Sequence, residues 1–371
     1  MGRDILALLV GLLGAATVLA TAFSAARTLV VPRGTTVLIT RWVMVAVRAL
    51  FDLRLRRART YHDCDHVLVL FGPVTVLALP VAWLALILTG FAAVFWSLGV
   101  RPWQDALLDS GSSLLTLGFH QPSGLATGAV QVVEAMVGLG LLAMVINYLP
   151  ALYSSYSRRE VLVTALEVEA GTPPSATELL ERLLRAKGVE LLDEYWHDWT
   201  RWFNELEETH SSNPILVFFR SPSPDRHWVT AAGAVLDSAA LVSSTFIAQG
   251  TQPSHAGLCV RAGHLALRRI GDYFHMPYEM PYDAGGRRNA PIAVTREEYD
   301  DACRRLRAAG AQLRTDRDQA WREFAACRVC YEGVLLRFAS LTTAPPAPWS
   351  ADRPIPFHRL PVTSRRARPG T

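Results

Sequence analysis

The chain has 371 residues and a net charge of +4, with 50% hydrophobic and only 19% charged residues. Its mean hydropathy of +0.19 is too apolar for an ordinary soluble protein. The apolar residues form long runs in the N-terminal part, and most charged residues follow them. Arginine clusters lie beside these runs, so membrane topology explains the positive charge and nucleic acid is not an expected partner. We therefore predict an all-α membrane protein with an α-helical cytosolic C-terminal domain.

Three segments meet the requirement of about 20 apolar residues for crossing a bilayer. They cover residues 5–25, 67–98 and 124–148. Pro73 and Pro80 lie within the second segment, so its start is expected to be kinked or interfacial, with the span nearer 79–98. The sequence thus predicts three transmembrane helices, with the lipid bilayer as a partner.

The arginine-rich loop after the first span sets the expected orientation. Its basic residues are Arg27, Arg33, Arg41, Arg48, Arg54, Arg56, Arg57 and Arg59. By the positive-inside rule this loop is cytosolic, the loop over 99–123 faces the exterior, and the chain after Ser157 is cytosolic again. We expect a multi-pass protein of the inner (plasma) membrane.

Residues 1–26 are expected to form the first transmembrane helix. The alternative is a cleaved signal peptide, because Ser24-Ala25-Ala26 resembles a small-residue cleavage site. Cleavage would leave the arginine-rich loop outside, against the charge rule, so a retained helix is favoured.

Residues 27–65 are expected to form a cytosolic amphipathic segment. Between positions 37 and 57, apolar residues alternate with arginines at helix-like spacing. The pattern predicts a helix that lies on the inner leaflet, with a helix packed on the cytosolic domain as the alternative.

The loop between the second and third spans begins like a short helix. Pro102 is expected at the first helical position and Asp105 in the first turn. A helix over 102–113 would be roughly 18 Å long, which is too short to cross a membrane but long enough to reach halfway. The segment Thr116-Leu117-Gly118-Phe119-His120 follows it directly.

This segment resembles the filter signature of potassium channels, usually T-x-G-[Y/F]-G. The order of outer helix, short pore helix, filter and inner helix over 66–156 is also similar to the pore domain of that family. The resemblance implies a re-entrant pore loop and an ion channel, not an enzyme, that conducts a monovalent cation, with K⁺ favoured. One loop per chain supplies a quarter of such a filter, so a homotetramer is implied, and no cofactor is needed.

The residue types of this filter have chemical reasons. Gly118 permits the backbone dihedrals that turn carbonyl oxygens toward a dehydrated cation. Thr116 can add its hydroxyl at the inner end, while Leu117 and Phe119 are expected to point outward and brace the filter. His120 stands at the position of the second filter glycine. An imidazole there would make conduction depend on pH, and a solvated loop residue is the alternative.

Other functions remain open. Because His120 and Gln121 replace the glycine and the acid of the family pattern, a non-selective cation pore is one alternative. A second alternative is that the loop over 99–123 is an extracellular connector in which the sequence Thr-Leu-Gly-Phe occurs by chance. In that case the chain would be a non-conducting membrane anchor for a helical signalling or scaffold domain.

The third span is expected to be the inner helix of the pore. Glu134 is an ionisable group inside this apolar span, so it should face water or a partner. Helical spacing places it with Gly138 on a face that would line a cavity, and a hydrogen bond to Ser112 or Ser113 behind the filter is the alternative. Gly138 and Gly140 permit either bending or close helix packing.

Residues 157–341 are predicted to form a helical cytosolic domain. Its expected helices cover 176–186, 189–209, 225–248, 255–273, 295–309 and 312–340. Alternation over 214–219 is the one strand-like pattern. Acidic residues and three tryptophans, Trp196, Trp199 and Trp202, indicate a helix with one acidic and one aromatic face.

Two features complete this C-terminal half. Cys327 and Cys330 form a lone C-x-x-C pair without further ligands at suitable spacing, so no metal site is expected. The tail over 342–371 is rich in proline and arginine, and such a composition predicts disorder.

Overall fold

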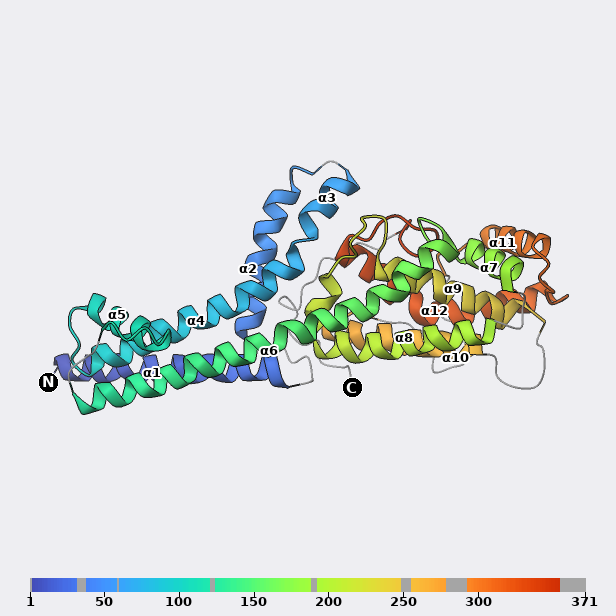
Figure 1. Cartoon of the computed structure of the whole chain (residues 1–371). Coiled ribbons are helices and arrows are strands. Elements are labelled where there is room, and N and C mark those ends of the chain that lie inside the picture. Colours follow the sequence, from blue (N-terminus) through green and yellow to red (C-terminus); the bar gives the residue numbers. More distant parts are fainter. Residues whose placement is uncertain are drawn as a thin grey trace, which may run out of the picture. The chain divides into compact units, whose positions relative to one another are not determined.

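The structure, a computed structural model, describes residues 2–31, 38–58, 60–120, 124–187, 192–247, 255–277 and 292–353. Every regular element in these residues is a helix, and one isolated β-bridge joins Phe246 to Leu313 (Figure 1). Backbone contacts divide the chain into two compact units. The first comprises Met1–Leu50 and Pro73–Ser154, and the second comprises Phe51–Gly72 and Ser155–Thr371.

The first unit is built from long apolar helices. They are α1 (Gly2–Val30), most of α2 (Leu38–Leu55), α4 (Phe71–Ser97), α5 (Trp103–Leu114) and the first part of α6 (Leu125–Ala170). The segments long and apolar enough to cross a membrane are Gly2–Val30, Tyr61–Ser97 and Leu125–Ala170. The prediction of an all-α protein with three candidate membrane spans is confirmed.

The spans pass through prolines without losing their helical backbone. α4 continues through Pro80 and α6 through Pro150. Helical backbone of the second span already begins at Phe71 and is not confined to 79–98. Pro73 lies in the first turn of α4, where its missing N–H costs no hydrogen bond.

Small residues bring α1 and α4 into close contact. A side chain at Gly14 would overlap with the carbonyl oxygen of Gly90, and a β-carbon at Gly90 would lie 2.8 Å from Cγ2 of Val18. Such close backbone approach is typical of helix pairs in membranes, where packing drives association. Fully buried Trp83 and Phe95 of α4 extend this core.

The second unit is a helical bundle. Its helices are α3 (Tyr61–Leu68), α7 (Ala176–Lys187), α8 (Leu192–Ser212), α9 (Trp228–Thr245), α10 (His255–Tyr273), α11 (Arg296–Ala308) and α12 (Arg317–Thr342). The helices expected between 176 and 340 are present, with ends shifted by a few residues. The segment that alternates like a strand is instead a 3₁₀ helix, η1 (Pro214–Phe218). Nearly every side chain of α9 is buried, which makes it the central helix of the bundle.

The amphipathic character expected for α8 is confirmed. Trp196, Trp199 and Trp202 are 1–3% exposed, whereas Asp193 and Asp198 are exposed. The three rings lie on one face because they are spaced by three residues along a helix. The aromatic face therefore belongs to the core of the second unit.

The C-terminal tail is partly packed, which corrects the prediction of disorder over 342–371. Residues 343–353 lie against the second unit, where Trp349 is 8% and Ser350 is 0% exposed. Composition alone cannot reveal this packing, because it depends on one tryptophan meeting a buried partner. Residues 354–371 lie outside the described residues.

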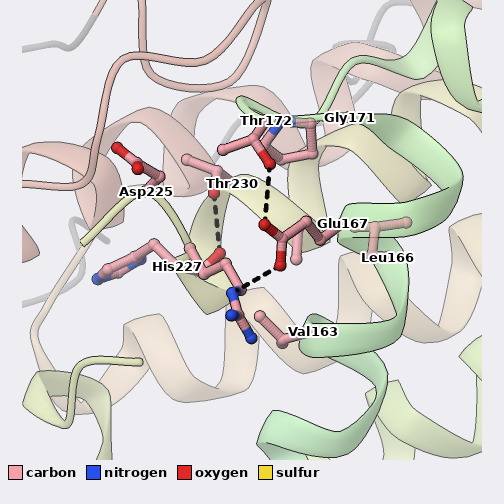
Figure 2. Close-up of a pocket in the computed structure, with 11 residues that line it drawn as sticks. Val163, Leu166, Glu167, Gly171, Thr172, Asp225, His227 and Thr230 are labelled. Atoms are coloured by element: carbon pink, nitrogen blue, oxygen red, sulfur yellow. Dashed lines mark hydrogen bonds and ion pairs between the residues drawn. The ribbon is translucent and has the colours of Figure 1, made fainter. Parts of the chain in front are cut away.

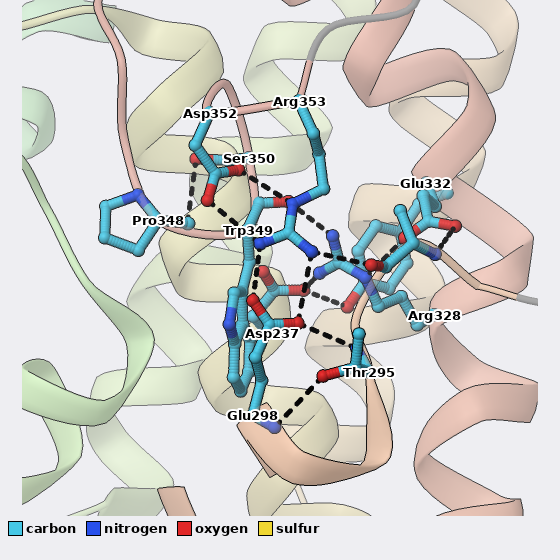
Figure 3. Close-up of polar contacts among 12 residues, drawn as sticks. Asp237, Thr295, Glu298, Arg328, Glu332, Pro348, Trp349, Ser350, Asp352 and Arg353 are labelled. Carbon is cyan, nitrogen blue, oxygen red and sulfur yellow. Dashed lines mark hydrogen bonds and ion pairs between the residues drawn. The ribbon is translucent and has the colours of Figure 1, made fainter. Parts of the chain in front are cut away.

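A buried ionic network holds this segment (Figure 3). Arg328 of α12 is fully buried and donates to the carbonyl oxygen of Trp349. Its charge is balanced by Asp237 of α9 and by Glu332, which lies 2.7 Å away. Tyr331 donates to the same Asp237 carboxylate at 2.6 Å. Because each buried charge has partners, removal of any one would leave an uncompensated group in the core.

Arg159 anchors the end of α6 in the second unit. Its guanidinium donates to the carbonyl oxygens of Leu216 at 2.9 Å and Phe219 at 2.7 Å, and it pairs with Glu160 at 2.6 Å. It also lies 3.2 Å from Nε2 of His210. A guanidinium only donates, so this nitrogen is the unprotonated acceptor. Burial and the Arg159 charge lower the pKa of His210 well below 6.5.

We expect His210 to make the second unit less stable in mild acid. The unfolded chain binds a proton at this imidazole below about pH 6.5, whereas the folded protein keeps it neutral. Its stabilisation is therefore complete above that pH and is lost as the pH falls toward the lowered pKa. His210→Gln should reduce the loss of melting temperature of the detergent-solubilised protein between about pH 7.5 and about pH 5.5.

The control is His197, which is exposed on the same helix. His197→Gln should keep the pH dependence of the parent protein, because this side chain is exposed rather than buried beside a cation. A pH dependence unchanged in His210→Gln would contradict this account.

Candidate functional site

Aromatic and cationic side chains gather at the N-terminal end of α5. The guanidinium carbon of Arg101 lies 3.4 Å from the ring centre of Trp96, and Trp103 packs edge-on against the same ring. Tryptophan is enriched at membrane–water interfaces. α5 begins at Trp103, one residue later than expected, and Pro102 is its N-cap. This cluster therefore marks the level at which one membrane surface is expected.

The C-terminal half of α5 is wedged between α4 and α6. Ser110 donates to the carbonyl oxygen of Leu88 in α4 at 2.9 Å and lies 2.5 Å from Oε1 of Glu134 in α6. At the end of α5, the carbonyl oxygen of Leu114 lies against Gly138, where any side chain would overlap with it. Gly138 thus permits close helix packing, one of the two roles that the sequence left open.

These contacts show how far along α6 the short helix reaches. At about 1.5 Å per residue, Gly138 lies about 20 Å along the axis from Leu125, where α6 begins. The hydrocarbon core of a bilayer is about 30 Å thick. A helix that crosses such a layer from Leu125 carries Gly138, and with it Leu114, past the midplane.

After α5 the chain turns back and is tied to the helix it has left. The N–H of Leu117 donates to the carbonyl oxygen of Ser112 at 2.8 Å, and the N–H of His120 donates to the Ser112 hydroxyl at 3.2 Å. The His120 imidazole pairs with the carboxylate of Asp109, which is 1% exposed. Sequence reasoning singled out His120 but missed Asp109. The signal for Asp109 was an acid one helical turn before Ser112 and Ser113, in a segment without lysine or arginine.

The return of the chain is also fixed against α6. Gln131 donates to the carbonyl oxygen of His120 at 3.2 Å. Gln131 precedes Gly138 by about 10 Å along the helix axis. Residues 115–120 are therefore non-helical backbone that runs beside α6 from the level of Gly138 back to that of Gln131.

The structure brings the predicted filter residues together in one exposed turn. Thr116 and Gly118 have positive φ angles of 54° and 72°, a conformation that glycine adopts readily and threonine rarely. Leu117 and Phe119 are 59% and 62% exposed. The hydroxyl of Thr116 donates to the carbonyl oxygen of Leu115 at 2.8 Å. Among the residues that the structure describes, positions 115–119 are thus left exposed.

Glu134 is fully buried against α5, which changes its expected role. The α6 face that it shares with Gly138, expected to line a cavity, packs on α4 and α5 instead. Helical spacing identifies residues that share a face, but not what the face meets. Glu134 instead forms a hydrogen bond with a serine of the short helix, which was the alternative expectation. The serine is Ser110 and not Ser112 or Ser113.

The opposite face of α6 is exposed and apolar. Its large exposed residues are Val132, Val133, Met136, Leu139, Leu142 and Ile146. Gly140 also lies there, with nothing within 4 Å of its β position. Gly140 therefore makes no close helix contact among the described residues, unlike Gly138.

A small pocket lies at the end of α6 in the second unit (Figure 2). Glu167 pairs with Arg226 at 2.9 Å beside it. Nδ1 of His227 accepts from the N–H of Val229, so Nε2 carries the proton, yet it has no partner among the described residues. Burial and the nearby Arg220 lower the pKa of this imidazole well below 6.5. The cavity volume of about 10 Å³ admits one water molecule and no substrate.

A larger hollow of about 410 Å³ lies between α6 and α8. Its lining includes Glu169, Glu194, Tyr195, Asp198 and Trp199. Across the part of the chain that the structure describes, no three His, Cys, Asp or Glu side chains are placed to hold a metal ion. Cys327 and Cys330 form no disulfide. The segment between α5 and α6 thus remains the candidate site.

Comparison with known proteins adds no identification, since no family model, no curated protein and no solved structure matches the chain. The candidate site rests on its own geometry. It consists of α5, the backbone over 115–120 and the α6 face from Gln131 to Gly138.

We expect the contact between Glu134 and Ser110 to stabilise the first unit. Glu134→Ala removes this contact and leaves a cavity, so it should cost about 1–3 kcal/mol, measured by thermal unfolding in detergent. Glu134→Gln should cost less, because the amide fills the same space and still reaches Ser110. Met136→Ala, on the exposed face of α6, is the control and should change stability by less than about 0.5 kcal/mol. Equal effects of the two alanine variants would show that the buried contact contributes nothing.

Proposed function

We propose that several copies of this chain, most simply four, form a pore that conducts monovalent cations, with K⁺ as the favoured ion. The observation that carries the proposal is the level of the non-helical backbone over 115–120, about 10–20 Å along α6. Unpaired N–H and C=O groups are not tolerated in lipid, so such backbone occurs at this depth only where protein buries it or water fills a cavity. A water-filled path between copies meets this requirement, and the segment is then a re-entrant pore loop.

The charges of the segment support a cation as the permeant ion. Residues 103–120 contain no lysine or arginine, and they contain Asp105 and Asp109. The carbonyl end of a helix carries partial negative charge, and α5 directs this end toward residues 115–120. A cation near Gly118 would therefore be stabilised by the helix and by the carbonyl groups of the loop.

The exposed side chains of the loop support an assembly. Leu115, Leu117 and Phe119 are 58–62% exposed in the single chain, beside backbone that must avoid lipid. Neighbouring copies would cover these side chains and leave the carbonyl groups on the axis. The exposed apolar face of α6 offers a complementary surface for such packing.

A non-selective cation pore is the second candidate, because of the contacts of His120. Its carbonyl oxygen accepts hydrogen bonds from Gln131 at 3.2 Å and from Ser112 at 3.3 Å. Its side chain is held by Asp109. This carbonyl is therefore engaged within the chain, and the outermost ion site of a potassium-type filter would lack one ligand from each copy.

The pore assignment predicts that Gly118→Val abolishes cation flux in liposomes that contain the purified protein. The β-branched side chain disfavours a φ of 72°, so the carbonyl groups beside it cannot keep their direction. The measurement compares K⁺ and Na⁺ flux. K⁺ flux well above Na⁺ flux supports the selective pore, and similar fluxes support the non-selective one.

The matched control is Gly99→Val. Gly99 also has a positive φ, 103°, and open space at its β position, but it precedes α5. The two variants carry a similar strain of about 1–2 kcal/mol, so only a role in the ion path separates them. Flux that survives in Gly118→Val would remove the filter assignment, and no flux from the parent would favour the membrane anchor.

The proposed orientation predicts which cysteines a membrane-impermeant maleimide reaches in intact cells. Gln104→Cys, exposed on the first turn of α5, should be labelled from outside. Arg56→Cys, exposed after α2, should be labelled only after the membrane is permeabilised. The reverse pattern would overturn the orientation without bearing on whether the protein conducts ions.

A further inference from the structure

α2 has two apolar faces, and only one of them is packed. Met44 and Val47 are 3% and 7% exposed and form the packed face. The other face is a stripe of exposed residues, Leu38, Trp42, Ala46, Ala49, Leu50 and Leu53. Its four large members are 61–68% exposed. With 3.6 residues per turn, the stripe falls within about 120° of the helix circumference, on the side away from Met44.

Arginines border the apolar stripe on both sides. Arg54 follows one edge; Asp52 follows the other, with Arg41 and Arg48 beyond it. Arg56 and Arg57 follow at the C-terminal end of the helix. The side chains of Arg54, Arg56 and Arg57 are exposed, and none of them makes an ion pair with a described acid. An apolar stripe between cationic borders is the pattern of a helix that lies in a membrane interface.

The start of α2 lies where the first span ends. Thr40 of α2 is hydrogen bonded to Thr28 of α1, with 2.9 Å between the hydroxyl oxygens. Ile39 and Val43 pack on the core of the first unit. Figure 1 shows α2 leaving the direction of α1 at a steep angle. A helix that leaves a span in this way runs along the membrane surface, with its outer face at the level of the lipid headgroups.

The charges select the occupant of this surface. A second copy of the chain, packed stripe to stripe, would bring together the five arginines between positions 41 and 57 of each copy, with only one acid per copy, Asp52, to offset them. Headgroup phosphates instead accept paired hydrogen bonds from guanidinium groups. The acyl chains beneath them accept Leu38, Trp42 and Leu50.

We propose that α2 docks on anionic lipid, with its apolar stripe among acyl chains and its arginines on headgroup phosphates. The surface thus favours an anionic phospholipid over a zwitterionic one. This inference does not depend on conduction, because it concerns a helix outside the proposed ion path. For α2, it also supports the inner-leaflet interpretation over a helix packed on the cytosolic domain.

The test places a bimane label at Ala46→Cys in the full chain, in which alanine replaces the five native cysteines. The elution volume in gel filtration checks that this variant folds like the parent protein. Vesicles contain brominated phosphatidylglycerol or brominated phosphatidylcholine at the same mole fraction. Bromine quenches the label on contact. We expect several-fold stronger quenching by the anionic lipid. The control label at Val132→Cys, exposed on α6, should show no preference.

Charge variants identify the cause of the preference. Replacing Arg54, Arg56 and Arg57 together by glutamine should bring quenching by the two lipids to parity, whereas replacement by lysine should keep the preference. In the parent sequence, about 1 M salt should weaken the preference for the anionic lipid. This measurement tests the electrostatic cause even if the glutamine variant does not fold. Equal quenching by both lipids in the parent would refute anionic docking. No quenching by either lipid would show that protein covers the stripe.

Discussion

The contact between the end of α5 and Gly138 is the constraint on which the candidate site depends. A carbonyl oxygen can reach the backbone of α6 only where no side chain intervenes, so Gly138 sets how far the short helix descends. Because α5 ends at the level of Gly138, the chain must return along the axis of α6 to the level of Leu125, where α6 begins. The hydrogen bonds from the N–H groups of Leu117 and His120 to Ser112 fix the first part of this return. Non-helical backbone beside α6 is thus a consequence of one close approach between helices.

The polar residues of this region compensate each other within the chain. His120 departs from the potassium-channel filter signature, but its imidazole has a partner in Asp109, and the two tie the end of the loop to the middle of α5. Glu134 and Ser110 tie the same helix to α6. A polar side chain in apolar surroundings costs less free energy when it has a hydrogen-bond partner, and one oxygen of each carboxyl group has such a partner here. The histidine is therefore one half of a packed pair, and its replacement by glycine would leave Asp109 buried without its partner.

Hydropathy runs and helical periodicity predict much of this fold. The features that they do not predict depend on contacts between residues far apart in the sequence. The candidate spans, α2 and the helices of the second unit follow from runs and periodicities that each segment carries within itself. The pairing of Asp109 with His120 and the burial of Glu134 depend on which helices meet, and a helical wheel does not encode that. Likewise, the segment 343–353 looked disordered by composition, yet Trp349 meets Arg328, whose buried charge required a carbonyl partner. Burial of a charge is a property of the assembled bundle, so no window of sequence reveals it.

The first unit has three exposed apolar surfaces, and the groups beside each surface determine which environment it suits. On α6 the face around Met136 carries no charge, which suits acyl chains or another apolar helix. On α2 the stripe around Trp42 is bordered by arginines, which suits the boundary between acyl chains and headgroups. Beside Gly118, exposed leucine and phenylalanine side chains lie next to non-helical backbone, and lipid alone satisfies only the side chains. The last surface is therefore the one where the proposed pore would place a neighbouring copy and water, and it is also where the filter-like residues lie.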